Sequence, residues 1–269
     1  MADAPDYANP PIAELVLGAQ FSPLTKLTSG HFGLFWKSLG DEWTDPSDGP
    51  LLDDNFERFD GPRWEQLPKL QLHFGPVRLP GRFVIGHRDK QRLLQVQATR
   101  FHFNWRKRDG FYPSYRRLIA EFEETFARFE AFARDAGLGS VAVNQWEMTY
   151  IDAFPQGEYW QTPTDWPAVL PGLFGPLPLA DGLVLETRAA EWNCEIAPKR
   201  GRLYVAAQLG QTPDSQKTAL VLHTTARGPV GKGGADTLRA GLDLGHDAAI
   251  ETFLRVTSDE IKARWGKKT

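Results

Sequence analysis

The sequence is poor in sulfur and has no long apolar segment. Cys194 is the only cysteine among 269 residues, so no internal disulfide can form, in agreement with a reducing compartment. The start of the chain lacks the basic and apolar pattern of a signal peptide. No stretch approaches the roughly 20 apolar residues of a membrane helix. We therefore expect a cytoplasmic protein that does not bind a membrane.

Motifs that mark a known chemistry are also missing. The six histidines lack close spacing such as H-x-x-x-H, and one cysteine cannot build a thiolate cluster, so we predict no metal and no cofactor. There is no G-x-S-x-G motif, and Cys194 is in phase with Trp192 and Ile196 on an expected strand, which indicates an inert core thiol. The glycine-rich residues 230–237 lack the spacing of a phosphate-binding loop. Whether the protein is an enzyme therefore stays open.

Apolar residues, by contrast, are plentiful. They make up 41% of the chain, against 24% charged residues, which is typical of a globular protein and not of a disordered one. A chain of this length is close to the size at which a single core divides into two. We expect either one large domain or two closely packed halves.

The net charge of −3 conceals two regions of opposite sign. Residues 41–66 contain nine acidic and two basic side chains, a net charge of −7. Residues 78–108 contain nine basic side chains and one acidic, a net charge of +8. One interpretation is two solvated surfaces; the other is a basic face that binds an anion and an acidic segment that competes for it.

The pattern of apolar residues and turn signals predicts two similar series of elements. In the first half, strands are expected at residues 12–21, 69–74, 82–87 and 92–105. Helices are expected at residues 28–39 and 115–136, the longer one capped by Ser114 and ended by Gly137. The acidic stretch that begins at residue 41 contains several prolines and is expected to be irregular.

In the second half, strands are expected at residues 141–154, 183–196, 202–209 and 218–227, and helices at 162–174 and 236–256. A capping box, Thr257-Ser-Asp-Glu260, predicts one more helix. Both halves thus have the order strand, short helix, three strands, long helix. We predict an α+β fold in which two similar halves form one curved, mainly antiparallel sheet with helices on one face. The halves are predicted at residues 1–154 and 183–269, with a proline- and tryptophan-rich connection at 155–182, as one compact unit.

The expected strand at residues 92–105 changes its apolar face halfway along. Strict alternation puts Leu94 and Val96 on the face that later carries three polar residues, Arg100, His102 and Asn104. The apolar residues further along, Phe101, Phe103 and Trp105, then point the other way. Either a β-bulge near residue 99 or 100 returns these rings to the core, or the polar residues line a pocket beyond the helix cover.

The matching strand of the second half carries similar residues, because His223 and Arg227 also share one face. If the halves are related by a pseudo-twofold axis, these side chains converge. Arginine offers a planar fork of donors for carboxylate or phosphate, and histidine can exchange a proton near neutral pH. The predicted ligand-binding residues are Arg100, His102, Asn104, His223 and Arg227. The alternative is that each histidine is an isolated, hydrogen-bonded strand residue.

These observations favour a non-catalytic binding protein that holds a small anionic ligand or a protein partner. The alternative is a nucleic-acid-binding protein in which aromatic rings stack on bases and basic residues neutralise phosphates. Its residues would be Arg82, Arg88, Arg92, Phe101, Phe103, Trp105, Arg106, Lys107 and Arg108. The acidic isoelectric point of 6.1 argues against this alternative.

A further alternative is a hydrolase or nuclease with His102 or His223 as acid and base, although no nucleophile or metal set accompanies them. Glu147 and Glu191 adjoin tryptophans on expected strands, where burial is expected to raise a carboxyl pKa. Nothing in the sequence indicates that these two carboxylates meet.

Three blocks of the sequence, NPPIAELVLGAQF, WEMTYIDAF and GHDAAIETFLRVTSDEIKARWG, resemble a sporadically distributed group of bacterial proteins of similar length. The resemblance spans essentially the whole chain, with Asp152 where that group more often has asparagine. It implies a bacterial protein that folds as a single unit, and an association with defence or mobile-element loci. It implies no activity and no catalytic residue.

Overall fold

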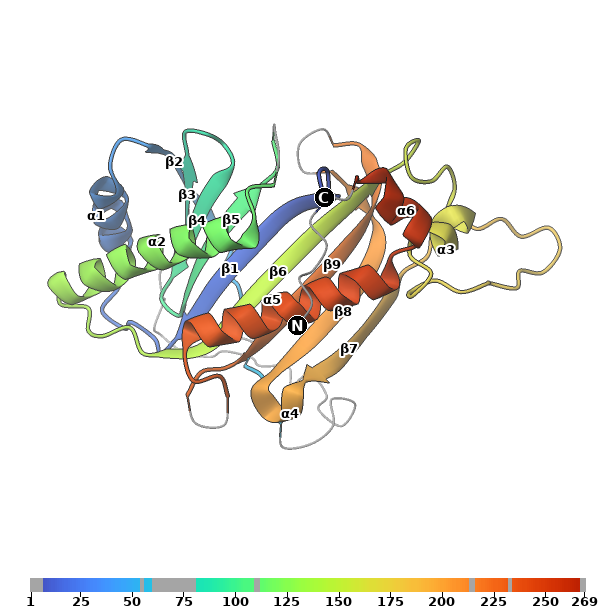
Figure 1. Cartoon of the computed structure of the whole chain (residues 1–269). Helices are drawn as coiled ribbons and strands as arrows, with labels where there is room; N and C mark the ends of the chain where they lie inside the picture. Colours follow the sequence, from blue (N-terminus) through green and yellow to red (C-terminus); the bar gives the residue numbers. More distant parts are fainter. Residues whose placement is uncertain are drawn as a thin grey trace.

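The structure, a computed structural model, describes residues 7–53, 56–59, 81–108, 112–212, 216–231 and 234–266. In these ranges nine strands form one antiparallel sheet in the order β2-β3-β4-β5-β1-β6-β9-β8-β7 (Figure 1). The two long helices, α2 and α5, lie across the same face of this curved sheet. The predicted α+β class is therefore confirmed.

The elements have the following bounds. The strands are β1 (Ile12–Phe21), β2 (Trp43–Gly49), β3 (Arg82–His87), β4 (Arg92–Gln97), β5 (Arg100–Arg106), β6 (Val143–Pro155), β7 (Ala190–Ile196), β8 (Gly201–Gln211) and β9 (Thr218–Pro229). The helices are α1 (Ser29–Leu39), α2 (Tyr115–Asp135), the 3-10 turn η2 (Pro163–Asp165), α3 (Trp166–Val169), α4 (Ala197–Arg200), α5 (Leu238–Val256) and α6 (Asp259–Arg264).

The sheet has a central antiparallel pair, β1 and β6, flanked by matching series of strands. On the β1 side follow β5, β4 and β3, and on the β6 side follow β9, β8 and β7. In each half a long helix, α2 or α5, comes directly after the strand that flanks the central pair. The two halves are therefore similar, and β2 is an additional edge strand of the first one.

The core lies between the sheet and the two long helices. On α2 the apolar residues at three-four spacing, including Phe122, Phe126 and Phe129, are buried and surround the ring of Phe101 on β5. Burial of each such ring is worth about 1.5–3 kcal/mol. On α5 the lack of side chains at Gly241 and Gly245 lets the helix approach Trp146 on β6, because a Cβ atom at Gly241 would lie 2.1 Å from the indole.

The change of face in residues 92–105 has a different cause from those expected. The segment is not one strand but a hairpin, in which β4 and β5 are joined by a two-residue turn at Ala98 and Thr99. Gln97 therefore pairs with Arg100, and Gln95 pairs with His102. No bulge is needed, because the turn itself places the apolar residues of both strands on the helix-covered face. Those residues are Leu94, Val96, Phe101, Phe103 and Trp105, all buried.

Several local predictions need correction. The acidic stretch is not irregular throughout, since β2 pairs with β3 at the edge of the sheet. The strand expected from residue 183 begins only at Ala190. The last helix is capped by the Ser258 side chain, which accepts a hydrogen bond from the Ile261 N–H, and not by Thr257. Ser114 occupies the cap position of α2 without a side-chain hydrogen bond. The strand expected at 69–74 lies outside the described residues.

Cys194 is not in the core. It lies on β7, the last strand of the sheet, and is exposed. Of the three residues expected on one buried face, Trp192, Cys194 and Ile196, only Ile196 is buried. The other two are exposed because β7 is an edge strand whose faces are largely accessible.

Candidate functional site

The sheet face opposite α2 and α5 carries a layer of polar side chains. Strand register sets one row of this layer directly across six strands. From β4 to β8 the row contains Gln95, His102, Gly18, Glu147, Arg227 and Arg202. The next row on one side contains Arg100 and Gln20. On the other side, Asn104 lies in the next row, and Glu14 and His223 lie in the row after that. We call this set the polar layer.

Glu147 is the centre of the first group in the polar layer. Its carboxylate pairs with the His102 Nε2 atom, accepts a hydrogen bond from Gln20 Nε2 at 3.1 Å and lies 3.4 Å from Arg100 Nε. Burial would raise its pKa, but the charges of His102, Arg100 and Arg227 lower the pKa to about 2. The expected upward shift for Glu147 is therefore wrong, because cationic partners outweigh burial.

Gly18 on β1 allows this group to form. It separates His102 on β5 from Glu147 on β6, so the two side chains meet above a residue that has none. A Cβ atom at this position would lie 2.4 Å from His102 Cδ2 and 2.9 Å from Glu147 Cγ. A larger residue would therefore displace one of the two partners.

Glu14 is the centre of the second group. Its carboxylate accepts a hydrogen bond from Asn104 Nδ2 and lies 3.1 Å from Arg106 Nε. His223 belongs to the same row, and the charge of Glu14 acts on it. Burial lowers the pKa of His223 in spite of this carboxylate. At neutral pH His223 is therefore uncharged.

The third group contains a carboxylate from outside the sheet. Glu57, in the acidic segment, accepts hydrogen bonds from Arg227 Nε at 2.6 Å, Tyr204 Oη at 2.7 Å and Arg202 Nη1 at 3.2 Å. Its side chain is only 2% exposed. The ion pair with Glu57 raises the pKa of Arg227 although burial opposes this shift. β8 and β9 thus supply a complete set of donors for one carboxylate.

The backbone of the acidic segment lies on the polar layer as well. Leu52 exchanges two hydrogen bonds with the side chain of Gln97, and the Asp53 carbonyl accepts one from Arg100 Nη2. The Glu57 N–H donates to Gln145 Oε1. These bonds to strands of both halves hold residues 51–53 and 56–59 against the sheet, and we call these residues the strap.

The five residues predicted as a ligand site all lie in the polar layer, but in three groups. Arg100 and His102 contact Glu147, Asn104 and His223 belong to the group around Glu14, and Arg227 pairs with Glu57. Sequence reasoning named Glu147 but not the residues it would meet, and it missed most of the other partners. The missed residues are Glu14, Gly18, Gln20, Glu57, Arg202 and Tyr204.

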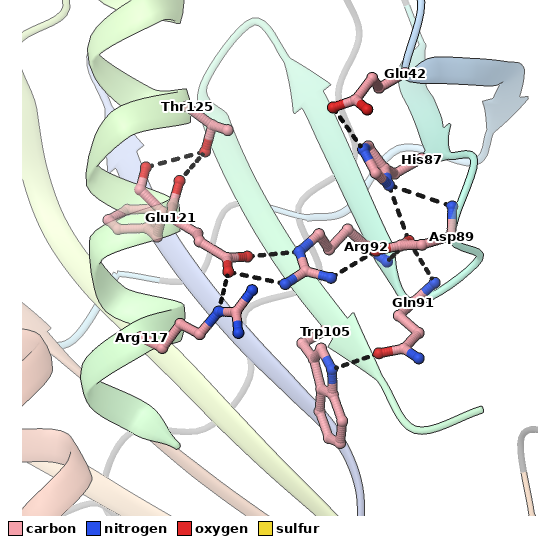
Figure 2. Close-up of polar contacts among 10 residues, drawn as sticks. Glu42, His87, Asp89, Gln91, Arg92, Trp105, Arg117, Glu121 and Thr125 are labelled. Atoms are coloured by element: carbon pink, nitrogen blue, oxygen red, sulfur yellow. Dashed lines mark hydrogen bonds and ion pairs between the residues drawn. The ribbon is translucent and has the colours of Figure 1, made fainter. Parts of the chain in front are cut away.

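The residues proposed for nucleic-acid binding are occupied within the protein. Phe101, Phe103 and Trp105 are buried on the helix-covered face, so their rings are not available for stacking on bases. Figure 2 shows how Arg92 is held by two hydrogen bonds to Glu121 on α2, with a third to Asp89. The other basic residues bond to protein groups too: Arg82 to Gln95, Arg88 to Asp41, Arg106 to Glu14, Lys107 to Asn9 and Arg108 to Lys90.

Comparison with known proteins adds no identification, since no family model and no curated protein matches the sequence. Within the described ranges, no group of three or more histidine, cysteine, aspartate or glutamate side chains is arranged to hold a metal ion. None of the helices in the described part of the chain combines the length and apolar character needed to cross a bilayer.

Proposed function

We propose that the protein is a non-catalytic binding protein whose polar layer holds a small anionic ligand in the place taken by the Glu57 carboxylate. The observation that carries the proposal is the set of three donors, Arg202, Arg227 and Tyr204, around one carboxylate. Two guanidinium groups and a hydroxyl at these distances form a receptor for a carboxylate or phosphate group.

The receptor is fixed before any ligand binds. Arg202 and Arg227 are directly opposed on β8 and β9, and the Arg227 guanidinium lies 4.5 Å from the centre of the Tyr204 ring. Strand register and this cation–π contact restrict the rotamers of the donors. A ligand therefore loses little affinity to the ordering of side chains.

Glu57 supports the proposal as a competitor that belongs to the chain. Glu57 belongs to residues 41–66, which have a net charge of −7, and its carboxylate is bound by the three donors. A ligand has to displace this carboxylate, so competition by Glu57 lowers the apparent affinity for the ligand.

Calorimetric titration tests the proposal with acetate, succinate and phosphate, each compared with chloride at equal ionic strength. Glu57→Gln, which removes the competing charge, is expected to bind at least one of these anions about tenfold or more tightly than the wild type does. Asp48→Asn, an exposed change in the same acidic region, serves as the matched control and is expected to leave the affinity unchanged.

A second substitution identifies the site. Tyr204→Phe on the Glu57→Gln background removes one donor, and we expect it to weaken anion binding by roughly tenfold, as for a hydrogen bond to a charged group. The proposal fails if Glu57→Gln binds none of the three anions better than chloride. It also fails if the double variant binds them as well as the single one.

The compartment and the partner belong to the same proposal. We place the protein in the cytoplasm because its single cysteine suits a reducing environment. The polar layer also suits an acidic side chain of a partner protein, but the small-anion reading accounts for the enclosed position of Glu57 more directly.

A further inference from the structure

A second candidate site lies on the opposite, helix-covered face of the sheet. It is a pocket of about 60 Å³, roughly the volume of two water molecules in the liquid. It lies between β6, β9 and α5, close to the start of β1. The pocket is lined by Pro10, Ile12, Tyr112, Tyr150, Asp152, Thr224, Ala249, Ile250 and Phe253. Most of these side chains are apolar or aromatic.

Two polar groups in this pocket have no partner among the described residues. Asp152 is 5% exposed, and no hydrogen bond or ion pair engages its carboxylate in the described part of the chain. The Thr224 hydroxyl is buried and likewise without a hydrogen bond there. An isolated carboxylate is costly to bury, and buried polar groups in proteins are normally hydrogen-bonded. A ligand that donates hydrogen bonds would satisfy both groups.

The remaining lining indicates the charge of that ligand. The aromatic side chains of Tyr112, Tyr150 and Phe253 line the same space. Aromatic rings beside a carboxylate are a favourable environment for an organic cation, since the ring faces and the carboxylate are both negative. We propose that this pocket binds a small alkylammonium ion, with its N–H groups donating to Asp152 and Thr224 and its methyl end among the rings.

Protonation of Asp152 couples this binding to pH. Burial alone raises the pKa of Asp152 to about 7, so the carboxyl group is largely neutral at pH 5.5 and largely ionised at pH 8. The ammonium ion needs the ionised form, so binding is tighter at pH 8.

Other titratable groups near the pocket behave differently. Tyr150 hydrogen-bonds to His246 on α5 and to Tyr112, and Tyr115 hydrogen-bonds to Asp243 on α5. Burial is the main cause of the raised pKa of both Tyr150 and Tyr115. Burial lowers the pKa of His246, and the charges of Asp247 and Asp243 oppose this shift. Asp152→Asn removes the titration of Asp152 and leaves that of His246, so comparison with the wild type shows which group causes the pH dependence.

Thermal unfolding of the full chain at pH 8 tests the proposal, with methylammonium chloride compared with potassium chloride at equal concentration. The affinity ceiling for a ligand of two heavy atoms corresponds to a Kd on the order of 10 mM, so concentrations up to about 100 mM are needed. At that level methylammonium is expected to raise the Tm by roughly 3–5 °C more than potassium. Tetramethylammonium, which is too large for the pocket, is expected to act like potassium.

Asp152→Asn preserves the shape of the side chain and is expected to abolish the methylammonium-specific shift, whereas Asp247→Asn on the exposed side of α5 retains it. Thr224→Val is a second pocket variant and is expected to reduce the shift, which keeps the test available if Asp152→Asn does not fold. Equal shifts with methylammonium and potassium at pH 8 overturn the proposal. A specific shift that survives Asp152→Asn, or that is larger at pH 5.5 than at pH 8, also overturns it.

Discussion

Glu147 and Asp152 are two buried carboxylates on opposite faces of the same strand, and their surroundings give them opposite pKa shifts. Cationic partners lower the pKa of Glu147 to about 2, and burial without such partners raises the pKa of Asp152 to about 7. The sequence places both residues on β6 but does not say which neighbours they meet. Burial alone predicts an upward shift for each, which is wrong for Glu147.

Glu147 should make the free energy of unfolding depend on pH in the acidic range. Its folded pKa lies below the ordinary value of 4.5, so the unfolded chain takes up a proton first as the pH falls. The stabilisation is complete above about pH 4.5 and is lost as the pH falls toward 2, at up to about 1.4 kcal/mol per pH unit. Urea unfolding of Glu147→Gln should therefore show a smaller loss of stability between pH 5 and pH 3 than the wild type shows.

An exposed helix carboxylate provides the comparison. Glu251→Gln on α5 removes a solvated carboxylate and should leave the wild-type pH dependence intact. If Glu147→Gln and the wild type lose stability in parallel between pH 5 and pH 3, the assigned ion-pair group around Glu147 is wrong.

At the scale of elements, the strength of the local signal decided what could be predicted. The apolar stripe of α2 has regular three-four spacing over 21 residues, and its bounds were predictable within a residue. The turn between β4 and β5 was not, because Ala98 and Thr99 lack the glycine, asparagine or proline that marks most tight turns. Strand β2 was missed because it contains Pro46, which is tolerated there only at the edge of the sheet.

Gly18 shows how strand packing forms the polar layer, and Gly18→Ala tests it. The new methyl group would overlap His102 and Glu147, which flank β1. We expect a loss of about 1–3 kcal/mol in the free energy of unfolding, as for an overpacked core site. The measurement is urea unfolding at neutral pH.

Gly33→Ala is the matched control for this substitution. Gly33 is exposed on α1 and a Cβ atom there meets nothing within 4 Å, so alanine should stabilise the helix by roughly 0.5–1 kcal/mol. Equal effects of the two substitutions would show that His102 and Glu147 do not require an empty position between them.

At the scale of the whole molecule, the sheet has one helix-covered face and one face on which the strap lies against the polar layer. Sequence periodicity could place Arg100 and His102 on one face of their strand, and His223 and Arg227 on one face of theirs, because side chains alternate along a strand. It could not place Glu57, which meets Arg227 across 170 positions of the chain. No local pattern encodes such a contact, so the carboxylate receptor emerges only from the assembled sheet.

The most direct measurement is chemical rescue of the Glu57→Ala variant by acetate. Its readout is the free energy of urea unfolding, measured in acetate and in chloride at equal ionic strength. Loss of the carboxylate removes the ion-pair partner that the buried Arg202 and the partly buried Arg227 share, and we expect a loss of about 3–5 kcal/mol in the free energy of unfolding. Acetate at ten times its Kd should restore about 1.4 kcal/mol of the unfolding free energy of Glu57→Ala, and chloride should restore none. The control variant Asp48→Ala should gain no such stability from acetate. If acetate and chloride stabilise Glu57→Ala equally, the polar layer holds no carboxylate site.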